Sequence, residues 1–210
     1  SAMGVLESGR AVVRLMACAV ALMSLVAGCG LNDRAAELTG YELEPAPNLA
    51  GLSLPAVEPD GGETPFDFVA EPGELLVVFF GYASCPDVCP TTLADLRAAF
   101  DDLGERAEFV DLAMVTIDPE VDTPQVLTPY VRSFIDSAIA VRTLDEEALR
   151  EVTRTIGADY GKDTVDGKDE VFHTASVYAI DDVGEVVLVW PFGTRPAEFA
   201  NDIAILQDRS

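Results

Sequence analysis

Two cysteines near the middle of the chain, Cys85 and Cys89, have the residue type and spacing that suit redox or metal chemistry. They follow an unbroken apolar run, Leu75–Phe80, which is typical of a strand buried on both faces. Pro90 comes directly after Cys89, and proline is favoured at the first position of a helix. We therefore expect Cys89 at a helix N-terminus, where the helix dipole and the free N–H groups favour a thiolate over a thiol.

Three kinds of site fit this pair of cysteines: a redox dithiol, a clamp for a soft metal ion, and a structural disulfide. Two thiolates suit Cu(I), and an added imidazole would give a site that also holds Cu(II). A disulfide that closes so short a loop removes little chain entropy, so the spacing argues against a purely structural bond. Between the cysteines, Pro86 restricts the loop, and Asp87 is a candidate helix cap or hydrogen-bond partner of a sulfur.

Histidine occurs once in the chain, at His173. It lies at the start of an alternating strand, Val171–Ile180, after a polar, glycine-bearing stretch at Tyr160–Glu170 that we expect to be an exposed loop. A single histidine in an apolar strand is more often a satisfied core residue than a metal ligand, so its immediate neighbours leave the choice open. No spaced pair of acids and no glycine loop in the sequence indicates acid–base catalysis or phosphate binding.

The segments around these residues predict strands and helices in alternation. Strands are expected near Leu52 and at Thr64–Val69, Leu75–Phe80, Ala107–Ile117, Ala138–Thr143, Val171–Ile180 and Glu185–Trp190. Helices are expected after Cys89 and at Gln125–Ile135, Asp145–Ile156 and Arg195–Leu206, the second capped by Asp122 or Thr123 ahead of Pro124. This order predicts an α/β fold: a central mixed β-sheet flanked by helices, with a β-hairpin near the C-terminus. A cysteine-bearing helix directly after a buried strand best matches the thioredoxin-like fold.

The N-terminal residues 1–29 have the pattern of an export signal. Arg10 and Arg14 form its basic part, and the apolar stretch Leu15–Ala27 is short for a membrane span, which needs about 20 residues. The end of the segment, Leu25-Val-Ala-Gly-Cys29, resembles the lipobox of bacterial lipoproteins, in which the cysteine is lipidated. The alternatives are ordinary signal cleavage and an uncleaved anchor helix. Each of them places the domain outside the cytoplasm, and lipidation would tether it to the outer face of the cytoplasmic membrane.

Beyond this leader we expect a flexible, proline-containing tether over residues 30–50 and one domain over residues 51–210. Ser1 and Ala2, ahead of Met3, are expected to be a cloning remnant or to result from an upstream start. The formal net charge is −24, from 37 acidic and 13 basic residues. Such a surface repels phosphate backbones, which excludes nucleic acid as a partner, and it favours small cations or a basic protein. The excess of acids also fits a simple solubility or salt adaptation.

One stretch carries a family resemblance. The run Phe80-Gly-Tyr-Ala-Ser-Cys85-Pro-Asp-Val-Cys89-Pro-Thr-Thr-Leu93 resembles the signature of the Sco/SenC proteins, which are thioredoxin-fold, membrane-tethered copper proteins that help assemble the copper centre of cytochrome c oxidase. The turn Asp118-Pro-Glu-Val-Asp-Thr-Pro124 is similar to one at the corresponding place in that family and in some peroxiredoxin relatives.

The resemblance implies a copper site with Cys85, Cys89 and His173 as the metal ligands. One Cu(I) or Cu(II) ion would be delivered to the copper-site subunit of cytochrome c oxidase or another copper protein, or the same cysteines would act as a redox dithiol that reduces a disulfide between the cysteines of that partner. The protein is expected to work as a monomer. One position departs from the family: Phe172 stands where an aspartate is common, and Asp169 or Glu170 is the available substitute.

Two competing functions remain. One is a thiol–disulfide oxidoreductase or peroxidase that uses Cys85 and Cys89 without copper. The other is a binding module with an inert disulfide. Replacement of His173 separates them from a copper protein, because neither needs an imidazole.

Overall fold

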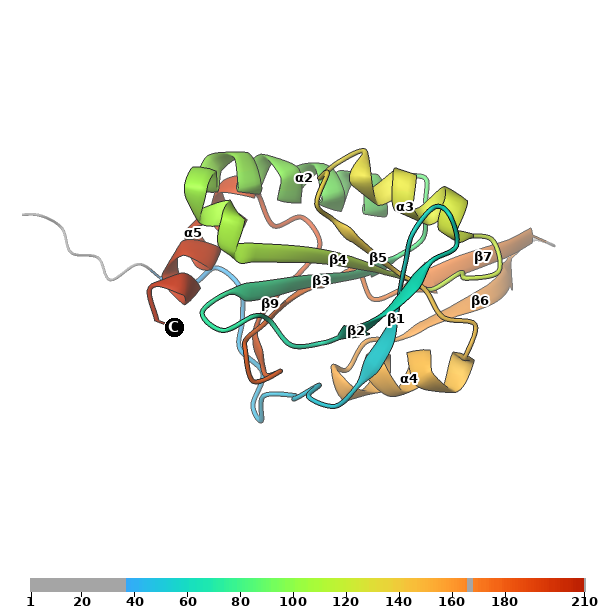
Figure 1. The fold of residues 1–210 in the computed structure, drawn as a ribbon, viewed down its shortest axis with the longest axis horizontal. Helices are drawn as coiled ribbons and strands as arrows, with labels where there is room; N and C mark the ends of the chain where they lie inside the picture. The colour runs from blue at the N-terminus through green and yellow to red at the C-terminus, as the bar shows by residue number, and fades with distance from the viewer. Residues whose placement is uncertain (1–36, 166–167, 210) are drawn as a thin grey trace, which may run out of the picture. The chain divides into compact units, whose positions relative to one another are not determined.

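The computed structural model describes residues 37–165 and 168–209 (Figure 1). The expected export signal, with Cys18 and Cys29, lies outside these residues. None of the helices in these described residues could span a membrane.

A seven-stranded mixed sheet forms the centre, in the order β2-β1-β5-β4-β3-β8-β9. The strands are β1 (Ser53–Val57), β2 (Glu63–Asp67), β3 (Leu75–Gly81), β4 (Val110–Thr116), β5 (Ile139–Val141), β8 (Val177–Ile180) and β9 (Val186–Trp190). β3, β4 and β5 run parallel, whereas β8 pairs antiparallel with β3 and β9 with β8. The carboxyl ends of β3 and β4 therefore meet at one edge, and the cysteines follow the end of β3.

Helices cover both faces of the sheet (Figure 1). Val77 and Phe79 of β3 pack with α2 (Val88–Leu103), α3 (Pro124–Arg132) and α5 (Pro196–Gln207). Val78 and Phe80, on the opposite face, pack with α4 (Glu146–Thr155). Every residue of β3 is buried, because successive side chains of a strand point to opposite faces and here both faces are covered. The predicted thioredoxin-like arrangement is confirmed.

The starts of three helices differ in detail from the sequence predictions. Pro90 is the third residue of α2, not the first; this is tolerated because the first N–H groups of a helix have no partner within it. Asp87 stands at the N-cap of α2, but its side chain makes no capping hydrogen bond. Thr123 is the N-cap of α3 and its side chain does not cap either. In α4 the carboxylate of Asp145 accepts from the N–H groups of the second and third helical residues, at 3.0 and 3.1 Å.

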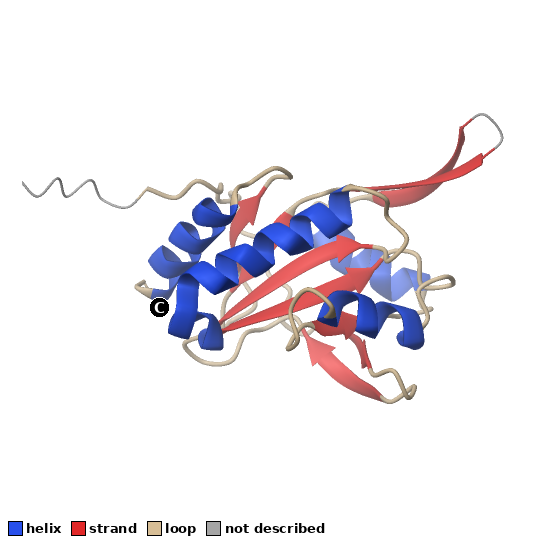
Figure 2. Cartoon of the chain, turned by 90° about the horizontal axis from the view of Figure 1, so that it is seen from above, coloured by secondary structure: helices blue, strands red, loops and turns tan. Residues whose placement is uncertain are grey.

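The stretch predicted as an exposed loop is a second, two-stranded sheet, so that prediction was wrong. β6 (Tyr160–Val165) pairs antiparallel with β7 (Lys168–His173), and the hairpin projects beyond the main sheet (Figure 2). The predicted strand Val171–Ile180 is accordingly divided between β7 and β8. The two arms are rich in charged residues, which obscured their pairing, although Asp166-Gly167 between them is a dipeptide favoured in hairpin turns. The predicted C-terminal hairpin is present as β8–β9.

The described part of the expected tether lies along the edge strand β9. Tyr41 and Val189 exchange two backbone hydrogen bonds of 2.9 Å, and the N–H of Leu49 donates to Gly184 at 2.8 Å. Leu49 is buried. This segment covers backbone groups that an edge strand otherwise exposes. A six-residue 3₁₀ helix, η1 (Gly104–Phe109), links α2 to β4.

Candidate metal centre

The two cysteines are placed by the junction between β3 and α2. β3 ends at Gly81, a turn brings the N–H of Cys85 to the carbonyl of Tyr82 at 3.2 Å, and α2 begins at Val88. The N–H of Cys89, in the first turn of the helix, points at the sulfur of Cys85 at 3.4 Å. Both cysteines are free thiols; Cys89 is fully buried and Cys85 is half-buried.

His173 joins the two cysteines across the fold. The ligating atoms of Cys85, Cys89 and His173 all lie within 4.8 Å of one another, and Nε2 of His173 is 3.6 Å from the sulfur of Cys89. In the chain segments that the structure describes, this is the only group of three such residues that could hold a metal ion.

The orientation of the imidazole leaves one nitrogen available. Nδ1 lies 3.1 Å from the carbonyl oxygen of Thr174. A carbonyl can only accept, so Nδ1 carries the proton and Nε2 presents its lone pair toward the sulfur of Cys89. The rings of Phe79 and Tyr82 meet the imidazole edge to face, each at a centroid distance of 6.0 Å. His173 is thus held as metal-ligating histidines usually are, with the other ring nitrogen bonded to an acceptor.

Hydrogen bonds hold together the base of the β6–β7 hairpin, which carries His173. The N–H of Thr174 donates to the carbonyl of Asp159 at 2.8 Å, and the N–H of Asp159 donates back to Oγ1 of Thr174 at 3.0 Å. On the other arm, Nζ of Lys162 lies 2.7 Å from the buried carboxylate of Asp118, which follows β4. These contacts hold the base of the hairpin together and fix its first arm to the chain that follows β4.

The two thiols differ electrostatically. Partial burial raises the pKa of Cys85, but the backbone N–H groups of Cys89 and Asp87, with the side chains of Cys89 and Tyr82, outweigh it and bring that pKa below its ordinary value. Burial raises the pKa of Cys89 strongly. A hydrogen bond with the Tyr82 backbone opposes this in part, and the nearby sulfur of Cys85 and the carboxylate of Asp122 add to the rise. Cys85 is therefore the more readily deprotonated thiol of the pair. The expectation that the helix N-terminus favours a thiolate at Cys89 was wrong, because burial outweighs the helix dipole there.

The imidazole is kept neutral. Burial lowers the pKa of His173, and the carbonyl of Thr174 opposes this only in part. A neutral imidazole is the form that binds metals.

Gly81 contributes to the site in a way that sequence analysis missed. A Cβ at this position would lie 2.8 Å from the sulfur of Cys89 and 2.7 Å from the ring of Phe79. The last residue of β3 must therefore lack a side chain for Cys89 to occupy its place. The only signal in the sequence is a glycine directly after a long apolar run.

Phe172 is directed away from the cluster. It pairs with Gly161 across the hairpin, and a Cβ on Gly161 would lie 2.7 Å from its ring, so the ring covers the glycine. Neighbouring side chains of a strand point to opposite faces, which separates Phe172 from His173. The carbonyl of Thr174 holds Nδ1 in place of a carboxylate. The side chains of the suggested substitutes, Asp169 and Glu170, lie outside the described part of the structure.

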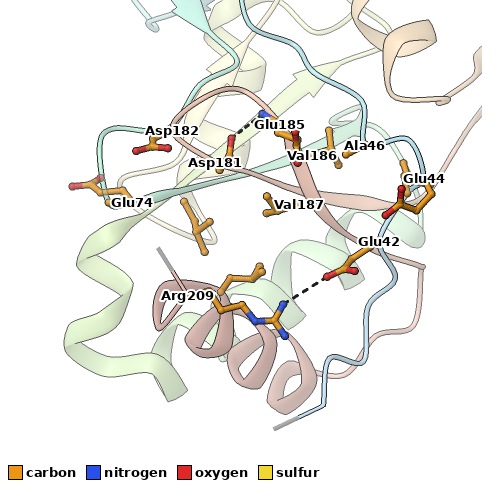
Figure 3. Close-up of a pocket in the computed structure, with 14 residues that line it drawn as sticks. Glu42, Glu44, Ala46, Glu74, Asp181, Asp182, Glu185, Val186, Val187 and Arg209 are labelled. Carbon is orange, nitrogen blue, oxygen red and sulfur yellow. Dashed lines mark hydrogen bonds and ion pairs between the residues drawn. The ribbon is translucent and has the colours of Figure 1, made fainter. Parts of the chain in front are cut away.

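A cavity of about 530 Å³ lies at the other end of β3, where that strand begins at Leu75 (Figure 3). Its rim is acidic, with Arg209 facing Glu42 at 3.6 Å and the N–H of Glu185 bound to Asp181 at 2.8 Å. It contains none of the predicted site residues.

Comparison with known proteins identifies related chains. The SCO1/SenC family model matches residues 63–207. A SCO2-like protein of Rickettsia prowazekii is 31% identical over 115 residues, covering 53% of this chain and 56% of that protein. The mitochondrial SCO1 homolog of Homo sapiens is 30% identical over 136 residues, covering 63% and 45%. The chain thus spans less than two thirds of the length of each of these relatives.

Solved structures give the same fold. The apo Sco1 protein of Thermus thermophilus is 30% identical with a TM-score of 0.65, covering 84% of this chain and 99% of that one. ScoI of Bradyrhizobium japonicum, solved with copper bound, is 28% identical with a TM-score of 0.62, covering 74% and 98%. At 19% identity, BsSco shows the fold alone; it is described as having a disulfide switch and belonging to the Sco family of cytochrome c oxidase assembly proteins.

Proposed function

The chain belongs to the SCO1/SenC family, and we propose that it binds one copper ion through Cys85, Cys89 and His173 as an assembly factor for the copper centre of cytochrome c oxidase. The observation that carries the proposal is the donor set: two sulfurs and one imidazole nitrogen within 4.8 Å of one another. Two thiolates suit the soft ion Cu(I), and the imidazole extends the set to Cu(II).

The residues present suit copper as cargo. Nε2 is the free nitrogen of a neutral imidazole, and the sulfur of Cys85 is deprotonated more readily than an ordinary thiol. Cys85 is also the more exposed of the two cysteines, so it offers the first thiolate to an incoming ion and the first position for exchange with a partner's ligand. Cys89 completes the set as its proton is released to solvent.

The location and partners form part of the proposal. The leader over residues 1–29 supports export, and lipidation at Cys29 would tether the domain to the outer face of the membrane. The net charge of −24 favours a copper acceptor with a basic docking surface.

A thiol–disulfide oxidoreductase is the second candidate, because Cys85 is only partly buried and has a lowered pKa, while Cys89 is fully buried. The Cys85 thiolate would attack a partner's disulfide and release one partner thiolate. Cys89, after losing its proton, would attack the Cys85 sulfur and release the second partner thiolate. Two electrons pass to the partner, and Cys85 and Cys89 end as a disulfide.

Titration of the reduced protein with copper tests the proposal and separates the two candidates. We expect one copper per chain and a strong thiolate-to-Cu(II) charge-transfer band, which His173→Ala abolishes or shifts. The same variant should leave disulfide reduction largely unchanged. Absence of tight copper binding, together with ready turnover of a disulfide or peroxide substrate, would refute the copper function and leave an oxidoreductase.

A further inference from the structure

A buried carboxylate, Asp122, lies behind the turn that carries Cys85. Asp122 is 0% exposed. Its Oδ2 accepts from the backbone N–H of Ala83 at 2.9 Å and from the hydroxyl of Thr116 at 2.6 Å. Its Oδ1 is buried and has no hydrogen-bond partner among the residues that the structure describes.

Burial of Asp122 with one carboxylate oxygen unpaired lowers the stability of the folded protein. Burying a carboxylate is strongly unfavourable unless hydrogen bonds replace its hydration. Asp202, which is also 0% exposed, meets that condition, because its oxygens accept from the N–H groups of Thr39 and Gly40 and from the indole of Trp190 at 2.8–3.0 Å. Asp122 is only half satisfied, which points to a role in the contact that it does make.

The hydrogen bond between Ala83 and Asp122 lies just beyond the last residue of β3 that pairs with a neighbouring strand. β3 and β4 pair as far as Gly81 and Thr116, and the N–H of Ile117 reaches the carbonyl of Gly81 at 2.9 Å. Beyond Gly81 the chain leaves the sheet and turns toward Cys85. The N–H of Ala83, two residues before Cys85, is bound only through the side chain of Asp122 in the hydrogen bonds of this described segment.

We propose that Asp122 is a positioning residue, which fixes the turn before Cys85 so that its sulfur faces Cys89 and His173 before copper binds. Thr116 holds Asp122 in turn, since its hydroxyl donates to Oδ2 and accepts from the N–H of Asp118 at 3.1 Å. The proposal rests on the proposed copper function. Without the carboxylate, the N–H of Ala83 loses its acceptor, and ordering the turn becomes part of the cost of binding the metal.

The test compares Asp122→Ala with the matched variant Asp202→Ala in the reduced full chain. Groups hydrogen-bonded directly to metal ligands typically change metal affinity about 10- to 100-fold. Asp122 acts through Ala83 and not on a ligand itself, so we expect Asp122→Ala to lose Cu(I) affinity at the lower end of that range, about 10-fold, with a shifted thiolate-to-Cu(II) band. Asp202→Ala should leave affinity and band unchanged even if it lowers Tm as much. Asp122→Asn keeps an oxygen for Ala83 and Thr116, so it should stay within about threefold of wild type.

Two further measurements keep the outcomes distinct. The dithiol–disulfide equilibrium with glutathione needs no copper, and Asp122→Ala should shift it whereas Asp202→Ala should not. If the wild-type protein binds no copper but this shift is seen, the copper function fails and the positioning role stands. The positioning role is overturned if the wild-type protein binds copper and Asp122→Ala has the same copper affinity and the same thiol equilibrium. It is also overturned if Asp202→Ala changes these two quantities as much as Asp122→Ala does. If Asp122→Ala does not fold, the same measurements can be made on Thr116→Val, which removes the hydroxyl that holds Asp122. Thr116→Ser, which keeps that hydroxyl, is then the control.

Discussion

The sulfur of Cys89 lies 3.6 Å from Nε2 of His173, although 84 residues separate the two in the chain. The contact depends on the central strand pairing. Phe79 of β3, ahead of the cysteines, lies opposite Val177 of β8, shortly after His173. A shift of this register would move the imidazole away from the sulfur. The site is therefore a property of the folded sheet as much as of the cysteine motif.

Replacing Gly81 with alanine should damage both stability and the site. The added methyl group would lie 2.8 Å from the sulfur of Cys89 and 2.7 Å from the ring of Phe79, in a buried part of the sheet. We expect a loss of about 1–3 kcal/mol in the free energy of unfolding, as for other overpacked cores, and weaker Cu(I) binding. Urea unfolding and competition titration measure the two effects.

Gly62→Ala is the matched control for this change. Gly62 is exposed, and the nearest atom to an added Cβ is the flexible carboxylate end of Asp60 at 3.1 Å. It should behave as wild type in both assays. A Gly81→Ala protein with wild-type stability and affinity would mean that Cys89 does not need the space that the glycine leaves.

The fold was largely predictable from the sequence because its main elements carry local signals. The apolar run of β3 and the acidic first turn of α4 each indicate their structure without reference to the rest of the chain. The only local signal for the β6–β7 hairpin is the turn dipeptide Asp166-Gly167 between its arms. Its arms are polar and lie outside the main sheet, so their pairing depends on contacts between strands and not on hydrophobic periodicity.

The candidate site was predictable in part. Cys85 and Cys89 follow from the strand, the proline and the helix pattern, whereas His173 was selected by family resemblance, because one histidine in a strand does not reveal what it faces. Asp122 was predicted as a possible helix cap, which is the usual role of an aspartate before a proline. Its actual partner, Ala83, lies 39 residues away, and no local pattern encodes that contact.

The two cysteines should react at different rates with iodoacetamide. The N–H groups and side chains around Cys85 bring its pKa below the ordinary thiol value of 9.0, while burial raises that of Cys89. In the native metal-free protein we expect Cys85 to be alkylated about 10-fold faster or more at pH 7, since the thiolate is the reactive form. Peptide mapping by mass spectrometry gives the rate at each site between pH 6 and 9. In urea the two rates should converge, and equal native rates would contradict the asymmetry.

Phe172→Asp should not strengthen copper binding, even though it installs the residue common in the family. Residue 172 faces Gly161 across the hairpin and points away from the imidazole, whose Nδ1 is already bound to the carbonyl of Thr174. We expect unchanged Cu(I) affinity and a loss of about 0.2–1 kcal/mol in stability from the cross-strand contact. Phe109→Asp, at an exposed phenylalanine outside the hairpin, is the control. A several-fold gain in copper affinity would show that a carboxylate at position 172 reaches the imidazole.

His173 should make the metal-free protein less stable in mild acid. Burial lowers the pKa of the imidazole in the folded state below its ordinary value of 6.5, so below that pH the unfolded chain binds a proton that the folded chain resists. The contribution of His173 is therefore complete above about pH 6.5 and declines as the pH falls through the folded-state pKa. Guanidinium unfolding with a chelator present, at pH 7.5 and 5.5, measures the decline.

The variant His173→Gln isolates this effect from the other groups that titrate. Burial also raises the pKa of Asp111 and of Asp122, and these carboxyl groups change stability with pH in both proteins. Subtracting the pH dependence of His173→Gln from that of wild type removes their contribution and leaves that of the imidazole. The difference should show wild type losing more stability than the variant between pH 7.5 and 5.5. Equal losses would mean that the imidazole is as easily protonated in the folded protein as in the unfolded chain, and that Nε2 is not held unprotonated with its lone pair facing the sulfur of Cys89.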